Sequence, residues 1–241
     1  KTNYLATISQ LQRVSSMLPS DQENFKARTL HPTHYGRFCP IETPEGTEIG
    51  LRKNLAILSR VSTRTKMNEE EIIKILEREK LDKEAVEGKD VVLNGKFVGT
   101  IKDNNEFVKI LREKRREGEL PEQMSIRNNL GFETIMLSSE AGRVLRPLII
   151  VDNGVPRINN NHLIQIQQGN LNWKDLFEKG LIEYIDAAEE ENALVSLTEE
   201  ELTSEHTHLE IDPISLFGAV TSLVPYGNHN QSSRLNRGSK T

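Results

Sequence analysis

Proline and glycine crowd the stretch from Leu30 to Gly50, and this crowding limits the possible folds more than any other feature of the sequence. The residues concerned are Pro32, Gly36, Pro40, Pro44, Gly46 and Gly50. Proline lacks a backbone N–H and has a fixed φ, while glycine accepts positive φ, so no regular helix can run through the stretch. The sequence therefore predicts a long loop held in specific turns. Ordered loops of this kind often carry functional groups.

Apolar residues at helical spacing precede this loop. They are Tyr4, Leu5, Ile8, Leu11 and Val14. Their spacing predicts an amphipathic helix that ends near Pro19, followed by a polar loop over residues 20–24. Further along the chain, Asn68 followed by Glu71 is a capping-box signature, which predicts that another helix begins there.

Strand signals appear in the middle of the chain. Asn94-Gly95 interrupts the segment 91–99, and this dipeptide favours the positive φ values of a tight hairpin turn. Asp103 is placed to cap a following helix. The apolar residues 148–151 predict another strand.

A last helix is expected near the end of the chain. Asp212 precedes Pro213, which places a capping carboxylate before proline at the first helical position and predicts a short helix over 214–224. Helices and strands alternate without an internal repeat. The predicted fold class is α+β, with several small mixed domains joined by ordered Pro/Gly-rich loops.

Cysteine usage and hydropathy exclude several protein classes. Cys39 is the only cysteine among 241 residues, which excludes an internal disulfide framework and a cysteine-rich zinc site within this chain. The apolar runs are too short to cross a bilayer. No basic and then apolar leader follows Lys1, so we expect a cytosolic or nuclear protein without a membrane partner.

The net charge of the chain is -5, but the charged residues are distributed unevenly along the sequence. Residues 183–212 hold eleven acidic residues and no Lys or Arg, whereas 213–241 hold three basic residues and no acid. Residues 1–60 hold eight basic and five acidic side chains, and 61–120 hold fourteen of each. Two mildly basic ends therefore flank a neutral and then acidic middle. The acidic run is interpreted as a solvated face or, alternatively, as a docking surface for basic factors.

Segments from two regions of the sequence resemble signatures of one family. Residues 31–46 (HPTHYGRFCPIETPEG) resemble the fork region in the second-largest subunit of multisubunit DNA-directed RNA polymerases of the archaeal and eukaryotic kind. Residues 205–213 (EHTHLEIDP) and 229–234 (HNQSSR) resemble the start of the hybrid-binding region of that subunit. Gly227-Asn228 and Ser233 depart from the family pattern, in which a Pro-acid pair and a proline are common.

The resemblance extends to the residues between these segments. The segments 93–95, 142–148 and 189–193 resemble the two external domains of the same subunit. The resemblance implies four regions: a fork region over 1–62, external domain 1 over 63–125, external domain 2 over 126–200, and the start of the hybrid-binding region over 201–241. Because residues 67–118 balance their charges and carry their own helix and hairpin signals, we also expect them to be stable separately.

Membership of this family would imply a nucleotidyltransferase that is active only when assembled, so the isolated chain is expected to be inactive. The implied partners are the largest subunit and other polymerase subunits, the DNA template, the RNA–DNA hybrid and nucleoside triphosphates. The resemblance places the catalytic Mg²⁺ on the largest subunit, so this chain is assigned no cofactor and no metal ligand. The chain is expected to be an internal piece of the subunit, from an archaeal cytoplasm in preference to a eukaryotic nucleus.

Arg234 is the first candidate substrate contact. Nucleotidyl transfer builds negative charge on the departing pyrophosphate, and a guanidinium group near its phosphates stabilises that charge. The resemblance matches Arg234 to the arginine that reaches the incoming nucleotide, with Asn230 and Gln231 beside it for hydrogen bonds to sugar, phosphate or backbone. The alternative is that Arg234 pairs with a carboxylate at a domain contact.

A second set of basic residues is expected to contact nucleic-acid phosphates. The resemblance places residues 16–24 in a loop near the downstream edge of the transcription bubble. The candidate contacts are Lys26, Arg28, Arg37, Arg237 and Lys240. Lys26 is equally compatible with a solvated basic turn.

Two pairs of polar residues receive structural interpretations. Glu42 and Glu45 have the spacing of paired carboxylates, but we expect them to accept hydrogen bonds that hold the Pro/Gly-rich loop. His206 and His208 would share one face of a strand, where they could start a metal site. Spacing supplies no further ligand, so structural hydrogen bonding is preferred. Two other function classes stay open: a non-catalytic interaction module and a His/Glu metal hydrolase.

Overall fold

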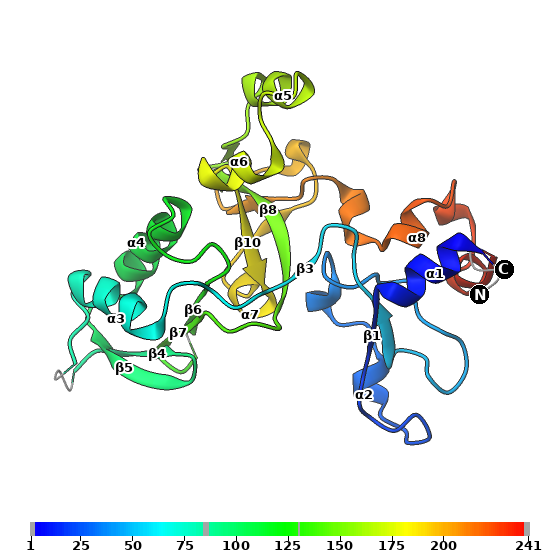
Figure 1. The fold of residues 1–241 in the computed structure, drawn as a ribbon, viewed down its shortest axis with the longest axis horizontal. Coiled ribbons are helices and arrows are strands. Elements are labelled where there is room, and N and C mark those ends of the chain that lie inside the picture. Colours follow the sequence, from blue (N-terminus) through cyan, green and yellow to red (C-terminus); the bar gives the residue numbers. More distant parts are fainter. Residues whose placement is uncertain (1–2, 84–86, 130, 239–241) are drawn as a thin grey trace. The chain divides into compact units, whose positions relative to one another are not determined.

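The computed structural model describes residues 3–83, 87–129 and 131–238 (Figure 1). The chain divides into two compact units. The terminal unit comprises 1–60 and 212–241, and the central unit comprises 61–211. The central unit is therefore an insertion between two halves of the terminal unit. No helix among the described residues is both long and apolar enough to span a bilayer.

Short elements joined by loops build the terminal unit. They are α1 (Tyr4–Leu11), β1 (Arg13–Ser15), α2 (Phe25–Arg28), η1 (Pro32–His34), β2 (Arg52–Asn54), η3 (Pro213–Leu216), α8 (Ala219–Ser222), η4 (Gly227–His229) and α9 (Ser232–Gly238). The segment 30–50 contains only the short 3₁₀ turn η1 as helix, as its prolines and glycines predict.

The first helix is shorter than its apolar pattern predicts. It ends at Leu11, and the chain continues as β1, which pairs antiparallel with β2 so that Val14 lies opposite Lys53. The expected continuation of the helix through Val14 was wrong. Strand pairing with a segment about forty positions away outweighs the weak helical preference of a few residues.

The predicted helix over 214–224 is also interrupted. Asp212 accepts a hydrogen bond from the Ile214 amide at 2.8 Å, as the capping pattern predicts. The chain then extends at Phe217, whose carbonyl accepts a hydrogen bond from the Ile57 amide at 2.9 Å. Gly218 forms a bridge with Ala56, and a Cβ here would lie 3.1 Å from a carboxylate oxygen of Glu42. Close packing against the N-terminal half therefore breaks the helix.

Two sheets with their helices build the central unit, which the chain enters through β3 (Arg60–Val61). The first sheet and its helices comprise α3 (Glu69–Arg78), β4 (Lys89–Leu93), β5 (Lys96–Ile101), α4 (Asn104–Arg116), β6 (Ser125–Asn129) and β7 (Thr134–Ser138). The remaining elements are β8 (Val144–Asp152), β9 (Val155–Pro156), α5 (Asn160–Gln167), α6 (Trp173–Glu178), β10 (Ile182–Asp186), α7 (Ala187–Glu190), β11 (Val195–Ser196), η2 (Glu199–Glu201) and β12 (His208–Leu209). This mixture confirms the α+β class.

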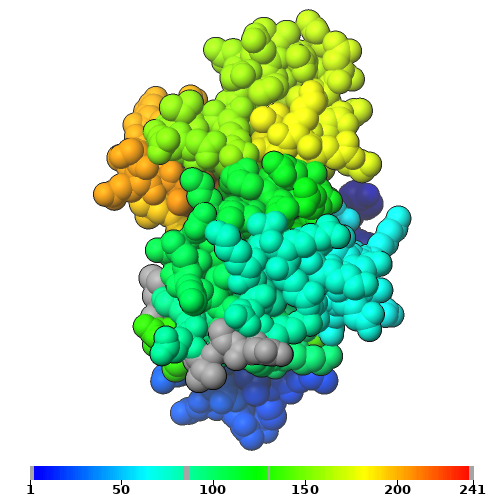
Figure 2. All heavy atoms as spheres, turned by 90° about the vertical axis from the view of Figure 1, so that its left-hand side faces the viewer, coloured from blue at the N-terminus to red at the C-terminus, as the bar shows by residue number. Residues whose placement is uncertain are grey.

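The first sheet has the strand order β5-β4-β7-β6 and packs against α3 and α4. Its buried core includes Ile72, Leu76, Phe107, Leu111 and Ile135. In the space-filling view, residues from this part of the chain form a continuous surface coloured cyan to green (Figure 2).

Local signals in this part of the sequence are confirmed. Asn68 and Glu71 exchange capping-box hydrogen bonds of 2.9 and 3.0 Å at the start of α3. Asn94 and Gly95 have φ values of 49° and 79° in the turn between β4 and β5. Asp103 accepts hydrogen bonds from two amides in the first turn of α4.

The second sheet has the order β10-β8-β12-β11 along its main path. Its core includes Leu145, Ile149, Phe177 and Tyr184. The rings of Phe177 and Tyr184 stack, with their centroids 4.4 Å apart. The strand predicted over 148–151 is part of the longer β8.

The compact units and the expected regions divide the chain differently. The units separate after residues 60 and 211, near the expected boundaries at 62/63 and 200/201. The expected boundary at 125/126 falls inside β6, within a sheet whose β4 and β5 come from the preceding region. Both expected external domains therefore lie in one compact unit.

Candidate nucleotide and nucleic-acid interface

Charge is segregated between the two units. The terminal unit holds 11 Lys and Arg and 6 Asp and Glu, which gives a net charge of +5. The central unit holds 20 basic and 30 acidic residues, which gives a net charge of -10. Folding thus gathers the two basic ends of the chain into one unit, where positive charge favours the approach of anions.

Within the terminal unit, residues near the end of the chain contact the 31–46 loop. The side-chain amide of Asn236 in α9 donates a hydrogen bond to the Ile41 carbonyl at 2.7 Å. The thiol of Cys39 lies 3.4 Å from the hydroxyl of Thr221 in α8. These contacts join residues more than 180 positions apart. The contact of Asn236 holds α9, the helix that carries Arg234, against the 31–46 loop, and the contact of Thr221 holds α8 there.

A buried polar network sits at the base of this loop. Glu42 is 2% exposed and accepts a hydrogen bond from the Ser9 hydroxyl at 2.7 Å. The amide of Asn54 donates to the same hydroxyl at 3.0 Å. Glu42 thus links α1, the loop and, through Ser9, β2. Glu45 is exposed, so the two carboxylates lie in different surroundings.

Arg28 uses four of its five N–H donors on backbone carbonyls. The acceptors are Thr47 at 2.6 Å, Ser20 at 2.9 Å, Ile49 at 3.0 Å and Gln22 at 3.1 Å. Arg28 therefore ties the polar loop 20–24 to the loop 46–50. Sequence reasoning treated Arg28 as a phosphate contact and missed this function.

Gly50 permits the close approach at this tie. Its φ is +73°, and a Cβ there would lie 2.2 Å from the Arg28 carbonyl oxygen. Only glycine fits both the backbone conformation and the space. This requirement is the signal in the sequence that could have revealed the packing of the two loops.

Arg37 and Lys26 have different surroundings. Arg37 is 2% exposed, and its guanidinium donates to the Thr33 carbonyl at 3.3 Å. Lys26 is exposed on α2. Of these two candidate phosphate contacts, only Lys26 lies on the surface of the terminal unit.

His34 and Lys53 form a second feature that sequence reasoning missed. The ammonium group of Lys53 donates to the carbonyls of Ala27, at 3.3 Å, and Gly50. Burial lowers the pKa of Lys53. Burial and the neighbouring Lys53 and His31 lower the pKa of His34, which favours a neutral ring that accepts the His31 amide hydrogen at 3.2 Å. No motif spacing signals this pair.

The candidate substrate contacts lie on or next to α9. Arg234 is exposed, while its neighbour Leu235 is 7% exposed and anchors the helix in the terminal unit. Gln231 is exposed, and its carbonyl accepts the Leu235 amide hydrogen at 3.1 Å. The exposed Asn230 donates to the Tyr226 carbonyl at 3.4 Å. All three side chains are therefore exposed within a span of five residues.

Arg237 is exposed in the same helix, whereas Lys240 lies outside the described residues. Arg237 lines a cavity of about 210 Å³ together with Arg13, Glu45, Asn54 and Asn236. The cavity brings a predicted phosphate contact and Arg13, which sequence reasoning did not single out, to the same part of the terminal unit.

His206 and His208 do not form a pair. His206 lies outside β12 and accepts the Thr203 amide hydrogen at 3.0 Å. His208 is buried, with its Nε2 2.9 Å from Glu183 and its Nδ1 2.9 Å from the Thr207 hydroxyl. The expectation that a strand would hold both on one face was wrong. Within 3–83, 87–129 and 131–238, no three His, Cys, Asp or Glu are grouped to hold a metal.

Glu183 belongs to a buried network of charges in the central unit. Its carboxylate accepts hydrogen bonds from Arg115 at 2.7 Å and Arg116 at 2.6 Å. Burial opposes ionisation of Glu183, but the two guanidinium charges and the hydrogen bond with His208 prevail and hold its pKa well below the ordinary value. His208 therefore serves as a partner in a structural network.

Known proteins resemble the chain along nearly its whole length. Family models for RNA polymerase Rpb2 match in order: domain 3 over residues 1–61, domain 4 over 91–152 and domain 5 over 173–213. The chain is 40% identical over 250 residues to DNA-directed RNA polymerase subunit Rpo2 of Sulfolobus acidocaldarius, covering 97% of this chain and 22% of that protein.

Eukaryotic relatives show the same pattern. DNA-directed RNA polymerase III subunit RPC2 of Schizosaccharomyces pombe is 33% identical over 243 residues, covering 97% of this chain and 21% of that subunit. DNA-directed RNA polymerase II subunit RPB2 of Encephalitozoon cuniculi is 31% identical over 249 residues, covering 96% and 22%. The chain spans about a fifth of the length of these curated relatives. Three Rpb2 domains in sequence order and relatives from two domains of life show that the chain belongs to the Rpb2 family, the second-largest subunits of DNA-directed RNA polymerases.

Proposed function

We propose that the chain takes part in DNA-directed RNA synthesis within an assembled polymerase, and that its terminal unit contacts nucleotide and nucleic acid. The observation that carries the proposal is the position of Arg234. Its guanidinium is exposed on a helix that Asn236 anchors to the 31–46 loop, in a unit of net charge +5. An anchored helix holds a cation in a defined place, as binding to a transition state requires.

Arg234 would neutralise the charge that develops on the leaving pyrophosphate during nucleotidyl transfer. A planar guanidinium suits this function because it donates two parallel hydrogen bonds to phosphate oxygens. Asn230 and Gln231 would orient the nucleotide through hydrogen bonds to its sugar or phosphates. Their exposure beside Arg234 supports this assignment.

Lys26 and Arg237 are proposed contacts for backbone phosphates, since both are exposed in the basic unit. Lys240, outside the described residues, is proposed for the same function from the sequence alone. The surroundings of Arg28 and Arg37 support a different proposal for these two residues. Arg28 holds two loops together through four carbonyls, and Arg37 is buried, so both would position the loop that Lys26 flanks.

Within the part of the chain that the structure describes, the four candidate donors from the sequence do not gather around one point as a catalytic Mg²⁺ site requires. Glu42 is buried against Ser9, Glu45 is exposed, and His206 and His208 have separate partners. Magnesium prefers several carboxylate or phosphate oxygens around one point. The proposal that the largest subunit holds the catalytic Mg²⁺ rests on the family resemblance. The same mismatch leaves a His/Glu metal hydrolase without support.

The proposed partners are the largest subunit and other polymerase subunits, template DNA, the RNA–DNA hybrid and nucleoside triphosphates. The relatives include an archaeal subunit and eukaryotic ones, so the proposed location is an archaeal cytoplasm or, alternatively, a nucleus. An interaction module without a nucleotide contact is the second candidate. It would leave nucleotide addition independent of Arg234.

Single-nucleotide addition on a preassembled RNA–DNA hybrid tests the proposal. Polymerase assembled with Arg234→Ala should add nucleotide more slowly than polymerase assembled with Arg78→Ala, which removes an arginine from the last turn of α3 in the central unit. Subunit composition is compared first, by size exclusion. Normal addition kinetics in assembled Arg234→Ala enzyme would refute the contact and favour the interaction module.

A further inference from the structure

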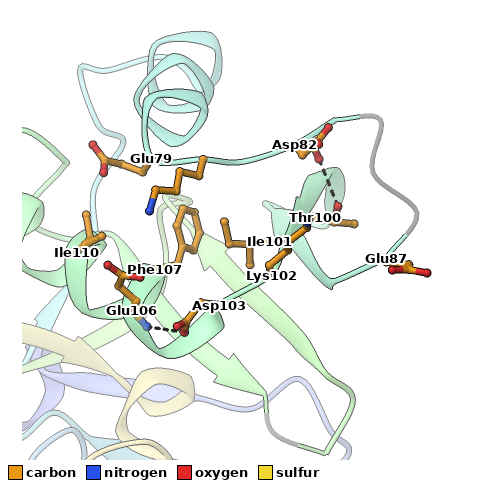
Figure 3. Close-up of a pocket in the computed structure, with 11 residues that line it drawn as sticks. Glu79, Asp82, Glu87, Thr100, Ile101, Lys102, Asp103, Glu106, Phe107 and Ile110 are labelled. Carbon is orange, nitrogen blue, oxygen red and sulfur yellow. Dashed lines mark hydrogen bonds between the residues drawn. The ribbon is translucent and has the colours of Figure 1, made fainter.

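A pocket of about 360 Å³ opens in the central unit where three elements meet. Its lining comes from the segment after α3, from the end of β5 and the two residues after it, and from the first half of α4 (Figure 3). The pocket lies wholly within residues 61–211, so it does not depend on the placement of the two units.

Apolar side chains form the floor of the pocket. Figure 3 shows the ring of Phe107 between Ile101 and Ile110. Phe107 is 2% exposed and Ile101 is 6% exposed, and both belong to the core of the first sheet. A floor that is part of the core is rigid, because core side chains are closely packed. An apolar side chain that enters the pocket would therefore meet a preformed surface.

Carboxylates dominate the rim. The acidic lining residues are Glu79, Asp82, Glu87, Asp103 and Glu106, against two ammonium groups, those of Lys80 and Lys102. The surrounding central unit carries a net charge of -10. The rim therefore attracts cations and repels the phosphates of nucleic acid.

Not all of these carboxylates are used by the fold. Glu79 pairs with Lys114 at 3.2 Å, and Asp103 caps α4 by accepting the amide hydrogens of Asn105 and Glu106 at 3.1 Å. Glu87 and Glu106 are exposed. Among the residues that the structure describes, no hydrogen bond or ion pair engages either of their carboxylates. These two side chains are available to a ligand.

We propose that this pocket docks a basic segment of a protein partner, with one apolar side chain on Phe107 and flanking Lys or Arg side chains on the acidic rim. Apolar anchors in preformed pockets supply most of the affinity at protein interfaces, and charges at the rim supply selectivity and speed of association. A bare polyamine would use the rim but leave the floor empty. A nucleic acid would meet the wrong charge.

Titration of the isotope-labelled full chain with an acetylated and amidated Lys-Arg-Phe-Arg-Lys peptide, followed by NMR, tests the proposal. Amide signals of residues 101–110 should shift most. Replacing the phenylalanine of the peptide with serine should weaken binding about tenfold, because the apolar anchor is lost. Higher salt should weaken binding of both peptides.

Matched variants separate the pocket from general acidity. The double variant Glu87→Gln/Glu106→Gln should bind the peptide about fivefold more weakly. Glu199→Gln/Glu200→Gln makes the same change of charge at η2, outside the pocket, and should alter affinity by less than about twofold. A nearly unchanged peptide affinity in the control variant, together with a weaker affinity in the pocket variant, would support the site.

Four outcomes would overturn the proposal. Equal losses in the two double variants would show attraction to overall charge alone. Equal affinity for the phenylalanine and serine peptides, or full competition by spermidine at the peptide's own concentration, would show that the floor is not used. Shifts confined to residues outside the pocket lining would place the binding elsewhere.

Discussion

Arg115 in α4 donates hydrogen bonds to both carboxylate oxygens of Glu189 in α7, at 2.6 and 2.9 Å, across 74 positions of sequence. The same guanidinium reaches Glu183 at 2.7 Å and the Met124 carbonyl at 2.6 Å. Arg115 and Glu189 are 4% and 2% exposed. This buried pair joins α4, which packs against the first sheet, to α7, which follows β10 of the second sheet.

Hydrogen bonds at β6 provide a second contact between the same two parts of the central unit. The side chain of Asn192 accepts the Asn128 amide hydrogen at 2.7 Å and donates to its carbonyl at 2.9 Å, in the manner of a neighbouring strand. Residues 67–118 were expected to be stable on their own. Cutting them away would remove Arg115 from Glu183 and Glu189, so the contacts argue for a central unit that unfolds together.

Arg115→Ala should lower the free energy of unfolding strongly, because it removes the guanidinium that bonds both oxygens of the buried Glu189 and leaves the buried Glu183 with Arg116 as its remaining guanidinium partner. Breaking a buried pair in this way costs about 3–5 kcal/mol. Arg127→Ala removes an arginine from an ion pair with Glu191, which is 55% exposed, and should cost no more than about 1 kcal/mol. Urea unfolding of both variants measures the difference. Equal losses would contradict the structural importance of the buried pair.

Stability of the central unit should fall in acid partly through Glu183. The folded pKa of Glu183 lies well below the ordinary value, because Arg115 and Arg116 outweigh its burial. Its contribution is therefore complete above the unfolded pKa, about 4.3, and is lost as the pH falls toward the lower folded pKa. Urea unfolding between neutral pH and pH 3 should show a shallower acid loss for Glu183→Gln than for the parent chain. An unchanged slope would contradict the assignment.

Gly50→Ala should destabilise the terminal unit more than Gly46→Ala. Both glycines have positive φ, +73° and +87°, so both substitutions carry the cost of a left-handed backbone, about 1 kcal/mol or more. A Cβ at Gly50 would meet a backbone atom at 2.2 Å, whereas a Cβ at Gly46 would have nothing within 4 Å. Thermal unfolding and hydrogen exchange at residues 20–24 measure the effect. Similar losses for both variants would show that the contact with Arg28 is unimportant.

Arg234→Ala in the assembled polymerase should slow nucleotide addition about thirtyfold to a thousandfold, the effect of losing about 2–4 kcal/mol of transition-state stabilisation. Arg234→Lys should restore only part of the rate, because an ammonium cannot reproduce the planar guanidinium. Measurements across nucleotide concentration separate the two possible contributions. A raised KM would indicate contact before the transition state, and a lowered kcat would indicate a contact that tightens within it.

A full rescue by lysine would contradict bidentate recognition, although it would retain the need for a positive charge. Arg78→Ala in α3 serves as the control for removing an arginine from the central unit. Its addition kinetics should match those of the unsubstituted enzyme.

Local chemistry determined several elements from the sequence alone. Asn68 and Glu71 satisfy amides at the start of α3, and Asn94-Gly95 accepts the positive φ of the β4–β5 turn. Asp103 caps α4 in the same way. Each signal acts within about three residues, so distant parts of the chain cannot easily change its outcome.

The motifs of residues 31–46 and 229–234 likewise identified the family and the candidate contact at Arg234. The sequence also showed two basic ends around an acidic middle. What it did not show is that these ends fold into one unit with a charge of +5, because that depends on contacts such as Asn236 with Ile41.

Only the tertiary structure decided the lengths of α1 and of the helices after Asp212, the function of Arg28 and the separation of His206 from His208. In each case a partner farther along the chain decides: β2 pairs with β1, Ile57 bonds Phe217, Arg28 bonds the carbonyls of the loop 46–50, and Glu183 bonds His208. Local preferences amount to fractions of a kcal/mol per residue. Buried hydrogen bonds and strand pairings outweigh them, and their partners become neighbours only when the chain folds.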